Sequence, residues 1–284
     1  MTTLLKYLLG ISFLLSTSNS MAQYVEIGLF GGAISFDGDV NKGSLLSNTQ
    51  PAFGAFVRYN INPHITTRIN FHKGTLKADD NNSSDLAIRQ RNFNFQSDLM
   101  ELSVIGEINI LPFVPDDPNH VFAPYLWAGI GVCWFDPTTN YQGKIIHLQA
   151  IGTEGQGLEG NAAKYGLTQL TVPLGIGLKY ALSPRIHIGL EIGYRYTTSD
   201  YIDDVSTVYL SPKTLQQNGD LAVALSNRTA EYTGLPANDL IGARRGNSNN
   251  KDSYLLWGVH LSVSLYRNNA YRGKKRNFKI TKWF

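Results

Sequence analysis

Apolar and polar residues alternate along several stretches of the chain, a pattern that predicts β-strands with two different faces. In 253–266, one face carries Leu255, Trp257, Val259, Leu261 and Val263. Residues 53–61 alternate in the same way, and a second run, 65–72, follows the dipeptide Asn62-Pro63, which predicts a β-hairpin. The same reading places further strands at 24–36, 99–111, 122–135, 167–182 and 185–198. The chain is therefore expected to form about eight antiparallel strands.

The connections between these strands alternate between short and long. Tight turns are expected at Asn62-Pro63 and Ser183-Pro184, and a proline-rich segment, 112–119, joins another pair of strands. Long polar loops are expected at 37–50, 75–97, 136–166 and 199–252. Short periplasmic turns and long extracellular loops are typical of transmembrane β-barrels, whose tilted strands need about 9–11 residues to cross a bilayer. The fold class expected is an all-β, up-and-down transmembrane barrel.

Charged residues gather on the face opposite the continuous apolar one. A charge facing lipid at mid-bilayer costs about 2–4 kcal/mol for Arg or Lys, so this face is assigned to the barrel interior. The interior of an eight-stranded barrel is just wide enough to be filled by side chains. We therefore expect a plugged lumen with a charge network formed by Glu26, Arg58, Arg68, Glu101, Glu107, Lys179, Glu191 and Arg195.

Aromatic residues on the outward face fall near the expected strand ends, as in the interfacial girdles of membrane proteins. These residues are Phe53, Phe71, Trp134, Tyr194, Tyr196 and Trp257 near one end, and Tyr59 and Tyr180 near the other. A soluble β-sandwich or lipocalin-like barrel is the alternative fold. It would turn its apolar face inward and expose the Glu and Arg residues.

The N-terminus predicts export. Lys6 precedes an apolar core at 8–15, and Ser20-Met21-Ala22 places small residues where a signal peptidase reads them. We expect a cleaved signal peptide at 1–22, an outer-membrane barrel at 23–267 and a basic periplasmic tail at 268–284. After the signal peptide no apolar run reaches the roughly 18 residues that a transmembrane helix needs. The single cysteine, Cys133, cannot form an intrachain disulfide and is expected to be buried and structural.

Charge is unevenly distributed along the 284 residues, although the formal net charge is only +3. The last 18 residues contain seven bases and no acid, so the rest of the mature chain is acidic. Charge runs are usually solvated, but aromatic residues are interleaved with these bases, as at binding interfaces. The tail is therefore expected to contact an acidic periplasmic partner or the membrane surface.

Other motifs have weaker chemical interpretations. The glycines of 152–157 are spaced as in a phosphate-binding loop, but no strand–turn–helix context accompanies them. Asp203-Asp204 and Asp116-Asp117 lack the spacing of a calcium loop and are expected to be solvated. His72, His187 and His260 are interpreted as interior hydrogen-bonding residues. No catalytic, cofactor-binding or metal-binding residue is predicted.

The loops carry motifs that resemble one family. Tyr141-Gln142-Gly143-Lys144, followed by Leu148-Gln149 and 152–157, resembles the third-loop signature of PorG-like outer-membrane barrels of type IX secretion systems. Similar segments occur at 26–40, 125–132, 173–180, 203–207 and 245–247. The resemblance covers about 24–266, and its loop motifs are more specific than its strands. It implies an integral outer-membrane component that tethers or helps assemble the periplasmic PorK–PorN ring and does not itself conduct protein.

The expected function is therefore that of a scaffold in a secretion machine, with outer-membrane lipids and PorK–PorN-like ring proteins as partners. Neither a nucleic acid nor a small-molecule substrate is expected. Two alternatives are a small-solute or hydrophobic-molecule channel and a hydrolase located at the barrel rim. Candidate partner-binding residues are Tyr141, Gln142, Gly143, Lys144, Arg272, Lys274, Lys275, Arg276, Trp283 and Phe284.

Overall fold

The computed structural model of the chain describes residues 24–40, 48–236 and 240–265. The predicted signal peptide, 1–22, and the predicted basic tail, 268–284, lie outside these residues. The proposed division of the chain at these two boundaries stays a prediction.

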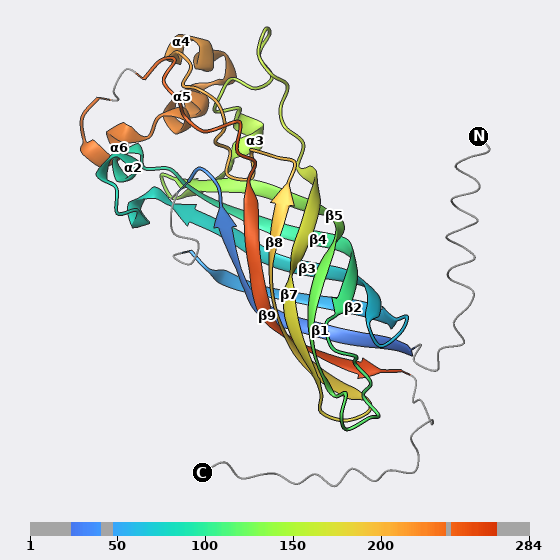
Figure 1. Cartoon of the computed structure of the whole chain (residues 1–284). Coiled ribbons are helices and arrows are strands. Elements are labelled where there is room, and N and C mark those ends of the chain that lie inside the picture. The colour runs from blue at the N-terminus through green and yellow to red at the C-terminus, as the bar shows by residue number, and fades with distance from the viewer. Residues whose placement is uncertain (1–23, 41–47, 237–239, 266–284) are drawn as a thin grey trace, which may run out of the picture.

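Eight long antiparallel strands form a closed barrel (Figure 1). Consecutive long strands pair with each other, β1 pairs with β9, and the pairing of β4 with β5 completes the ring. The prediction of an eight-stranded antiparallel barrel is confirmed. The strands are β1 (Tyr24–Asp37), β2 (Gln50–Asn60), β3 (Ile65–Asp79), β4 (Asn94–Asn109), β5 (Phe122–Tyr141), β7 (Thr168–Ala181), β8 (Ile186–Thr197) and β9 (Ser253–Ser264).

Buried and exposed residues alternate along these strands with a period of two, as the pleat requires. The exposed face is apolar: Leu29 is 68 % exposed, Ile130 is 72 % exposed and Leu170 is 60 % exposed. The eight charged side chains predicted for the lumen are all buried. A barrel with its apolar face outside and its charges inside fits a hydrocarbon environment and not water.

Several strands continue past their predicted ends on the side of the long loops. The loop expected at 75–97 is shorter, because β3 runs to Asp79 and β4 starts at Asn94. Strand β5 extends to Tyr141 and turns back into β6 (Lys144–His147), forming a two-stranded ribbon beyond the barrel. Polar residues such as Thr138 and Asn140 obscured this extension in the sequence. Above the bilayer, both faces of a strand can be polar.

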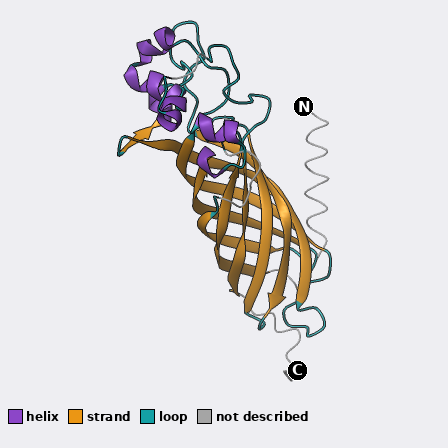
Figure 2. Cartoon of the chain, turned by 90° about the vertical axis from the view of Figure 1, so that its left-hand side faces the viewer, coloured by secondary structure: helices purple, strands orange, loops and turns teal. Residues whose placement is uncertain are grey.

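Short helices gather at one end of the barrel, which we call the loop end, and the tight turns lie at the opposite, turn end (Figure 2). The short helices at the loop end are η1 (Asp80–Asn82), α2 (Leu86–Arg91), α3 (Leu148–Ile151), α4 (Pro212–Leu215), η2 (Gln216–Asn218), α5 (Asp220–Ser226) and α6 (Thr229–Thr233). In the described part of the chain no helix is long and apolar enough to cross a membrane. Together with the segments that connect them, these helices form what we call the cap.

The interior has three layers along the barrel axis. A small apolar cluster of Phe113, Ala123 and Ala181 lies at the turn end, with Val121 against it. The charged network occupies the middle. A larger apolar cluster, including Phe30, Ile34, Leu99, Phe135 and Leu256, continues from the loop-end half of the barrel into the cap. Polar side chains are expected to line the lumen, but its loop-end part is apolar. The cap shields this part of the interior from water.

Candidate functional site

The lumen network begins near the turn end with Glu26 of β1. Its carboxylate lies 3.1 Å from Arg58 Nη1 and accepts hydrogen bonds from Asn60 Nδ2 at 2.8 Å and Ser262 Oγ at 2.7 Å. His187 Nδ1 is 3.3 Å from the same carboxylate. Arg58 faces Glu26 because the two are directly paired in the register of β1 and β2. The remaining partners come from β2, β8 and β9, so this carboxylate connects four consecutive strands of the ring.

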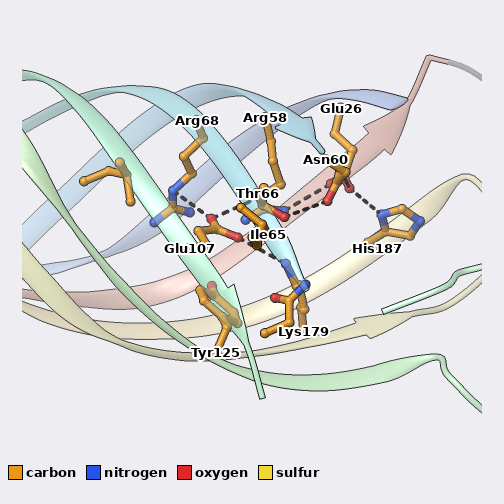
Figure 3. A network of polar contacts seen from close by, with 12 residues as sticks. Glu26, Arg58, Asn60, Ile65, Thr66, Arg68, Glu107, Tyr125, Lys179 and His187 are labelled. Carbon is orange, nitrogen blue, oxygen red and sulfur yellow. Dashed lines mark hydrogen bonds and ion pairs between the residues drawn. The ribbon is translucent and has the colours of Figure 1, made fainter. Parts of the chain in front are cut away.

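Glu107 of β4 is the centre of the network (Figure 3). Its carboxylate oxygens lie 3.3 Å from Arg58 Nε, 3.1 Å from Arg68 Nε and 3.1 Å from Lys179 Nζ. All four side chains are almost completely inaccessible to solvent. One carboxylate thus offsets charge on three cations, which makes the group highly interdependent.

The other two glutamates lie farther toward the loop end. Glu191 forms a bidentate pair with Arg68 from across the barrel and also accepts a hydrogen bond from Tyr125. Glu101 lies 3.7 Å from Arg195 Nε and accepts a hydrogen bond of 2.6 Å from Tyr254. The structure therefore places all eight predicted residues inside the barrel: six are joined by ion pairs, and Glu101 and Arg195 form a separate pair.

Sequence reasoning missed the inward-facing aromatic residues that fill the space between these charges. Tyr125 and Trp127 point into the barrel from β5 and are buried. They fit because glycines face them: a Cβ on Gly177 would lie 2.3 Å from the Tyr125 ring, and one on Gly193 would lie 2.2 Å from Trp127. The sequence does contain a signal for this packing. Glycines occupy inward-facing positions of β7 and β8, and the two on β7 have the same spacing as the bulky Tyr125 and Trp127 on the neighbouring β5.

The turn end is closed by the connection between β4 and β5. Phe113 turns into the barrel mouth, where its ring lies edge-on to His187 with centroids 5.3 Å apart. Its backbone N–H donates to Pro63 O at 3.0 Å, which ties this connection to the neighbouring turn. Lys179 Nζ lies 5.2 Å above the same ring. The network is thus covered by an aromatic residue on one side and by the apolar cluster on the other.

A second buried polar centre holds the cap together. Glu154, in the glycine-containing segment 152–157, lies 2.8 Å from Arg245 Nη1. It also accepts backbone hydrogen bonds from Ser206 and Thr207 at 2.9 and 3.1 Å. Burial would raise the pKa of Glu154, but Arg245 and these donors outweigh burial and lower it. Segment 152–157 is therefore bound to the loop between β8 and β9 through Glu154. The glycines of this segment adopt positive φ, which allows its sharp turns.

Asp203 and Asp204 are not solvated, so the expectation for this pair is wrong. Asp203 accepts hydrogen bonds from the backbone N–H groups of Asp39 and Val40, both at 3.1 Å. Asp204 accepts hydrogen bonds from Thr153 and Tyr165, and Arg245 lies beside it. Both carboxylates are buried because several loops converge on them, which no local pattern reports.

These buried acids should make the cap more stable at mildly acidic pH. Burial raises the pKa of Asp204 to about 6 despite the opposing charge of Arg245, whereas an unfolded Asp titrates near 3.9. The folded cap therefore binds the proton of the Asp204 carboxyl more tightly than the unfolded chain does. As a result, the free energy of unfolding of the cap increases as the pH falls from neutrality toward about 4. The pKa values of Asp203 and Asp252 are also raised by burial, and Glu154, whose pKa is lowered, stays charged through most of this window.

We expect hydrogen-exchange protection factors for 200–207 to be larger at about pH 5 than at about pH 7.5. The Asp204→Asn variant should show a smaller difference between the two conditions. Protection that decreases on acidification would contradict this assignment of the buried protons.

The candidate partner-binding residues fall at opposite ends of the molecule. Tyr141, Gln142, Gly143 and Lys144 form the tip of the β5–β6 ribbon at the loop end, where Gln142 and Gly143 adopt positive φ. Strand β9 finishes at the turn end, since Ser264 N donates to Arg185 O in the turn before β8. Arg272, Lys274, Lys275, Arg276, Trp283 and Phe284 follow it in sequence but lie outside the described residues. The ribbon tip is thus remote from the end where the described barrel leads into the tail.

His72, His187 and His260 lie inside the barrel, as interpreted from the sequence, and Cys133 is buried. Within 24–40, 48–236 and 240–265, no group of three or more His, Cys, Asp or Glu residues has an arrangement that could hold a metal ion. The candidate site consists of a buried charge network with two covered ends and of a cap joined by buried ion pairs.

Solved structures with a similar course of the chain are small outer-membrane proteins. Neisserial surface protein A matches with 10 % identity and a TM-score of 0.42, covering 84 % of this chain and 96 % of that one. OprG from Pseudomonas aeruginosa matches with 8 % identity and a TM-score of 0.39, covering 87 % and 100 %. Ail of Yersinia pestis in its heparin-analogue complex matches with 9 % identity and a TM-score of 0.40, covering 86 % and 99 %. Identities this low carry no information on function.

Comparison at the level of sequence gives a family. No curated protein matches the chain. The family described as "Domain of unknown function (DUF6089)" matches residues 5–221, which include seven of the eight barrel strands and the glycine-containing segment of the cap. The chain belongs to this DUF6089 family.

Proposed function

We propose that this protein is an outer-membrane scaffold of a type IX-like secretion machine, which tethers or helps assemble a periplasmic ring of PorK–PorN-like proteins. The observation that carries the proposal is the filled interior. Buried ion pairs occupy the middle of the barrel, Phe113 covers the turn end and the apolar cluster covers the loop end. A barrel filled in this way supplies a fixed point in the membrane and contact surfaces at its two ends.

The loop motifs that resemble PorG-like barrels support the assignment to a secretion machine. Two of these motifs, 152–157 and 203–207, are distant in sequence but meet in the cap through Glu154 and Thr207. A third, Arg245-Gly246-Asn247, contributes the guanidinium of the same centre. The three motifs therefore meet in one tertiary centre of this chain, and this meeting supports treating them as one feature.

Purification of the tagged, full-length chain from outer membranes tests this proposal. The ring proteins should be recovered with it, and deletion of 268–284 should reduce their recovery while the barrel still inserts. A Lys213→Glu change in α4 is the matched control, because it alters an exposed charge at the opposite, loop end and should leave recovery unchanged. Absence of ring proteins from the full-length sample would exclude the scaffold role. Normal recovery with the truncated chain would exclude the tail as the segment that binds the ring proteins.

Channel activity is the alternative function, and conductance separates it from the scaffold role. We expect the purified protein in planar bilayers to show no steady conductance, because buried ion pairs such as Glu107–Lys179 fill the lumen and the Glu191–Arg68 pair crosses it. A porin, whose barrel encloses an aqueous channel, supplies the positive control when measured in parallel. Steady open events from the wild-type chain would favour the channel.

A further inference from the structure

Two concavities lie one above the other on the outer wall of the barrel, along β8 and β9. The first is an apolar groove of about 490 Å³, lined by outward side chains of β7, β8 and β9 together with backbone of these strands. The second is a polar notch of about 400 Å³ at the loop end, lined by the ends of β1 and β8, the start of β9 and the segment before it. Neither belongs to the lumen or the cap centre described above.

The strand register makes these two features continuous. Successive outward pairs between β8 and β9 are Leu190–Val259, Ile192–Trp257, Tyr194–Leu255 and Tyr196–Ser253. The first two pairs line the groove, and Tyr194, Tyr196 and Ser253 line the notch. The last pair of the groove and the first pair of the notch follow each other directly, so the two concavities are adjacent along β8 and β9. At about 3.4 Å per residue the four rows extend over roughly 20 Å, comparable to one leaflet of a bilayer with a core of about 30 Å and its headgroup region.

The groove lies within the wall that faces the membrane interior. Ile176, Leu190 and Val259 are 56 %, 54 % and 45 % exposed, and Trp257 is half-buried beside them. A concave apolar surface in this wall is complementary to a hydrocarbon chain, which gains contact on several sides compared with a flat wall.

The notch has the composition of a site for a polar, ring-shaped headgroup. Tyr194 and Tyr196 stand with ring centroids 5.2 Å apart, and the Tyr194 hydroxyl is held by Asp37. Asp39, Asn249 and Asn250 add acceptors and donors suited to hydroxyl groups. Lys251 supplies a cation, with one of its N–H groups bonded to Ser248 O at 3.0 Å. Aromatic faces beside carboxylate and amide groups fit the ring and hydroxyl groups of a sugar, and the ammonium group of Lys251 fits an anionic substituent on that sugar.

We propose that the groove and the notch together bind one glycolipid of the outer leaflet, with an acyl chain along β8 and β9 and the sugar headgroup between Tyr194, Tyr196 and Lys251. The assignment requires a membrane-embedded barrel but not the secretion role. An annular lipid would meet the apolar wall anywhere around the barrel. This site differs because its polar and apolar parts are aligned on the same two strands.

The test uses native mass spectrometry of the full chain released from detergent micelles. The probe is a phosphorylated, acylated glucosamine disaccharide, with phosphatidylethanolamine as the competing lipid. A one-to-one complex with the disaccharide lipid is expected, with a dissociation constant on the order of tenfold below that of phosphatidylethanolamine. Ile192→Trp, which fills the groove, and Lys251→Glu, which reverses the headgroup charge, should each weaken binding by on the order of tenfold.

Matched controls lie elsewhere on the same molecule. Ile69→Trp adds the same bulk to an outward position of β3 that is 54 % exposed, and Lys213→Glu reverses an exposed charge in α4. Both should bind as the wild type does. If Ile192→Trp does not fold, Tyr196→Ala tests the headgroup site without altering the groove. Equal binding of the two lipids, equal loss in Ile69→Trp and Ile192→Trp, or a dimer in place of the lipid complex would each overturn the proposal.

Discussion

Replacing Glu107 by alanine should lower the free energy of unfolding by about 3–5 kcal/mol, the range found when one partner of a buried ion pair is removed. Arg58, Arg68 and Lys179 all lie within 3.3 Å of this carboxylate, and none of them can reach solvent. Without Glu107, three buried cations would face one another with only Glu26 and Glu191 nearby. The loss should therefore fall at the upper end of that range.

Urea titration of the barrel in lipid vesicles, followed by tryptophan fluorescence and by heat-modifiable migration on gels, measures this loss. Glu159→Ala is the control, because Glu159 is an exposed cap residue and its removal should change little. Equal stability of the two variants would mean that water enters the lumen and screens the network.

Replacing Arg245 by alanine should open the cap while leaving the barrel folded. The change leaves Glu154 and Asp204 buried without their shared cation, and removes a guanidinium that lies 4.6 Å from the centre of the Phe93 ring. A cost of about 3–5 kcal/mol would raise the population of the open cap by at least about two orders of magnitude.

Proteinase K treatment of intact cells should then cleave 148–167 much faster in Arg245→Ala than in the wild type. The neighbouring Arg244→Ala is a matched control, since the exposed Arg244 side chain donates to Gly246 O two residues away and the substitution leaves its backbone bridge to Val208 in place. Adding Glu154→Gln to Arg245→Ala should restore part of the protection by removing the unpaired charge. Cleavage at the same rate in both single variants would show that other contacts hold the cap.

Strand identity and facing could be predicted from residues because they are local properties. Along β9, Leu255, Val259 and Leu261 alternate with residues that turn inward, and this period of two is preserved in the folded strand. The tight turns beside Pro63 and Pro184 were equally readable, because proline and its neighbours restrict the backbone locally. The inward charges followed from the same alternation and from the cost of placing charge in lipid.

The extents of β3, β4 and β5 at the loop end were not readable in this way. There the bilayer no longer demands an apolar face, so strand residues such as Thr75, Gln96 and Thr138 look like loop residues. Pairing with a neighbouring strand, and not the residue pattern, decides where these strands end.

By itself, the sequence determined that this chain forms a barrel with an apolar outside and a charged inside, since alternation and the solvent preference of each side chain suffice for that. Only the tertiary structure decided which charges meet. Arg68 and Glu191 are 123 residues apart, and they pair because closure of the ring places β3 opposite β8. The burial of Asp203 and Asp204 was likewise decided by loops that converge from different strands. A local pattern reports which face a residue occupies, whereas its partner across the lumen or cap depends on the closure and stagger of the whole ring.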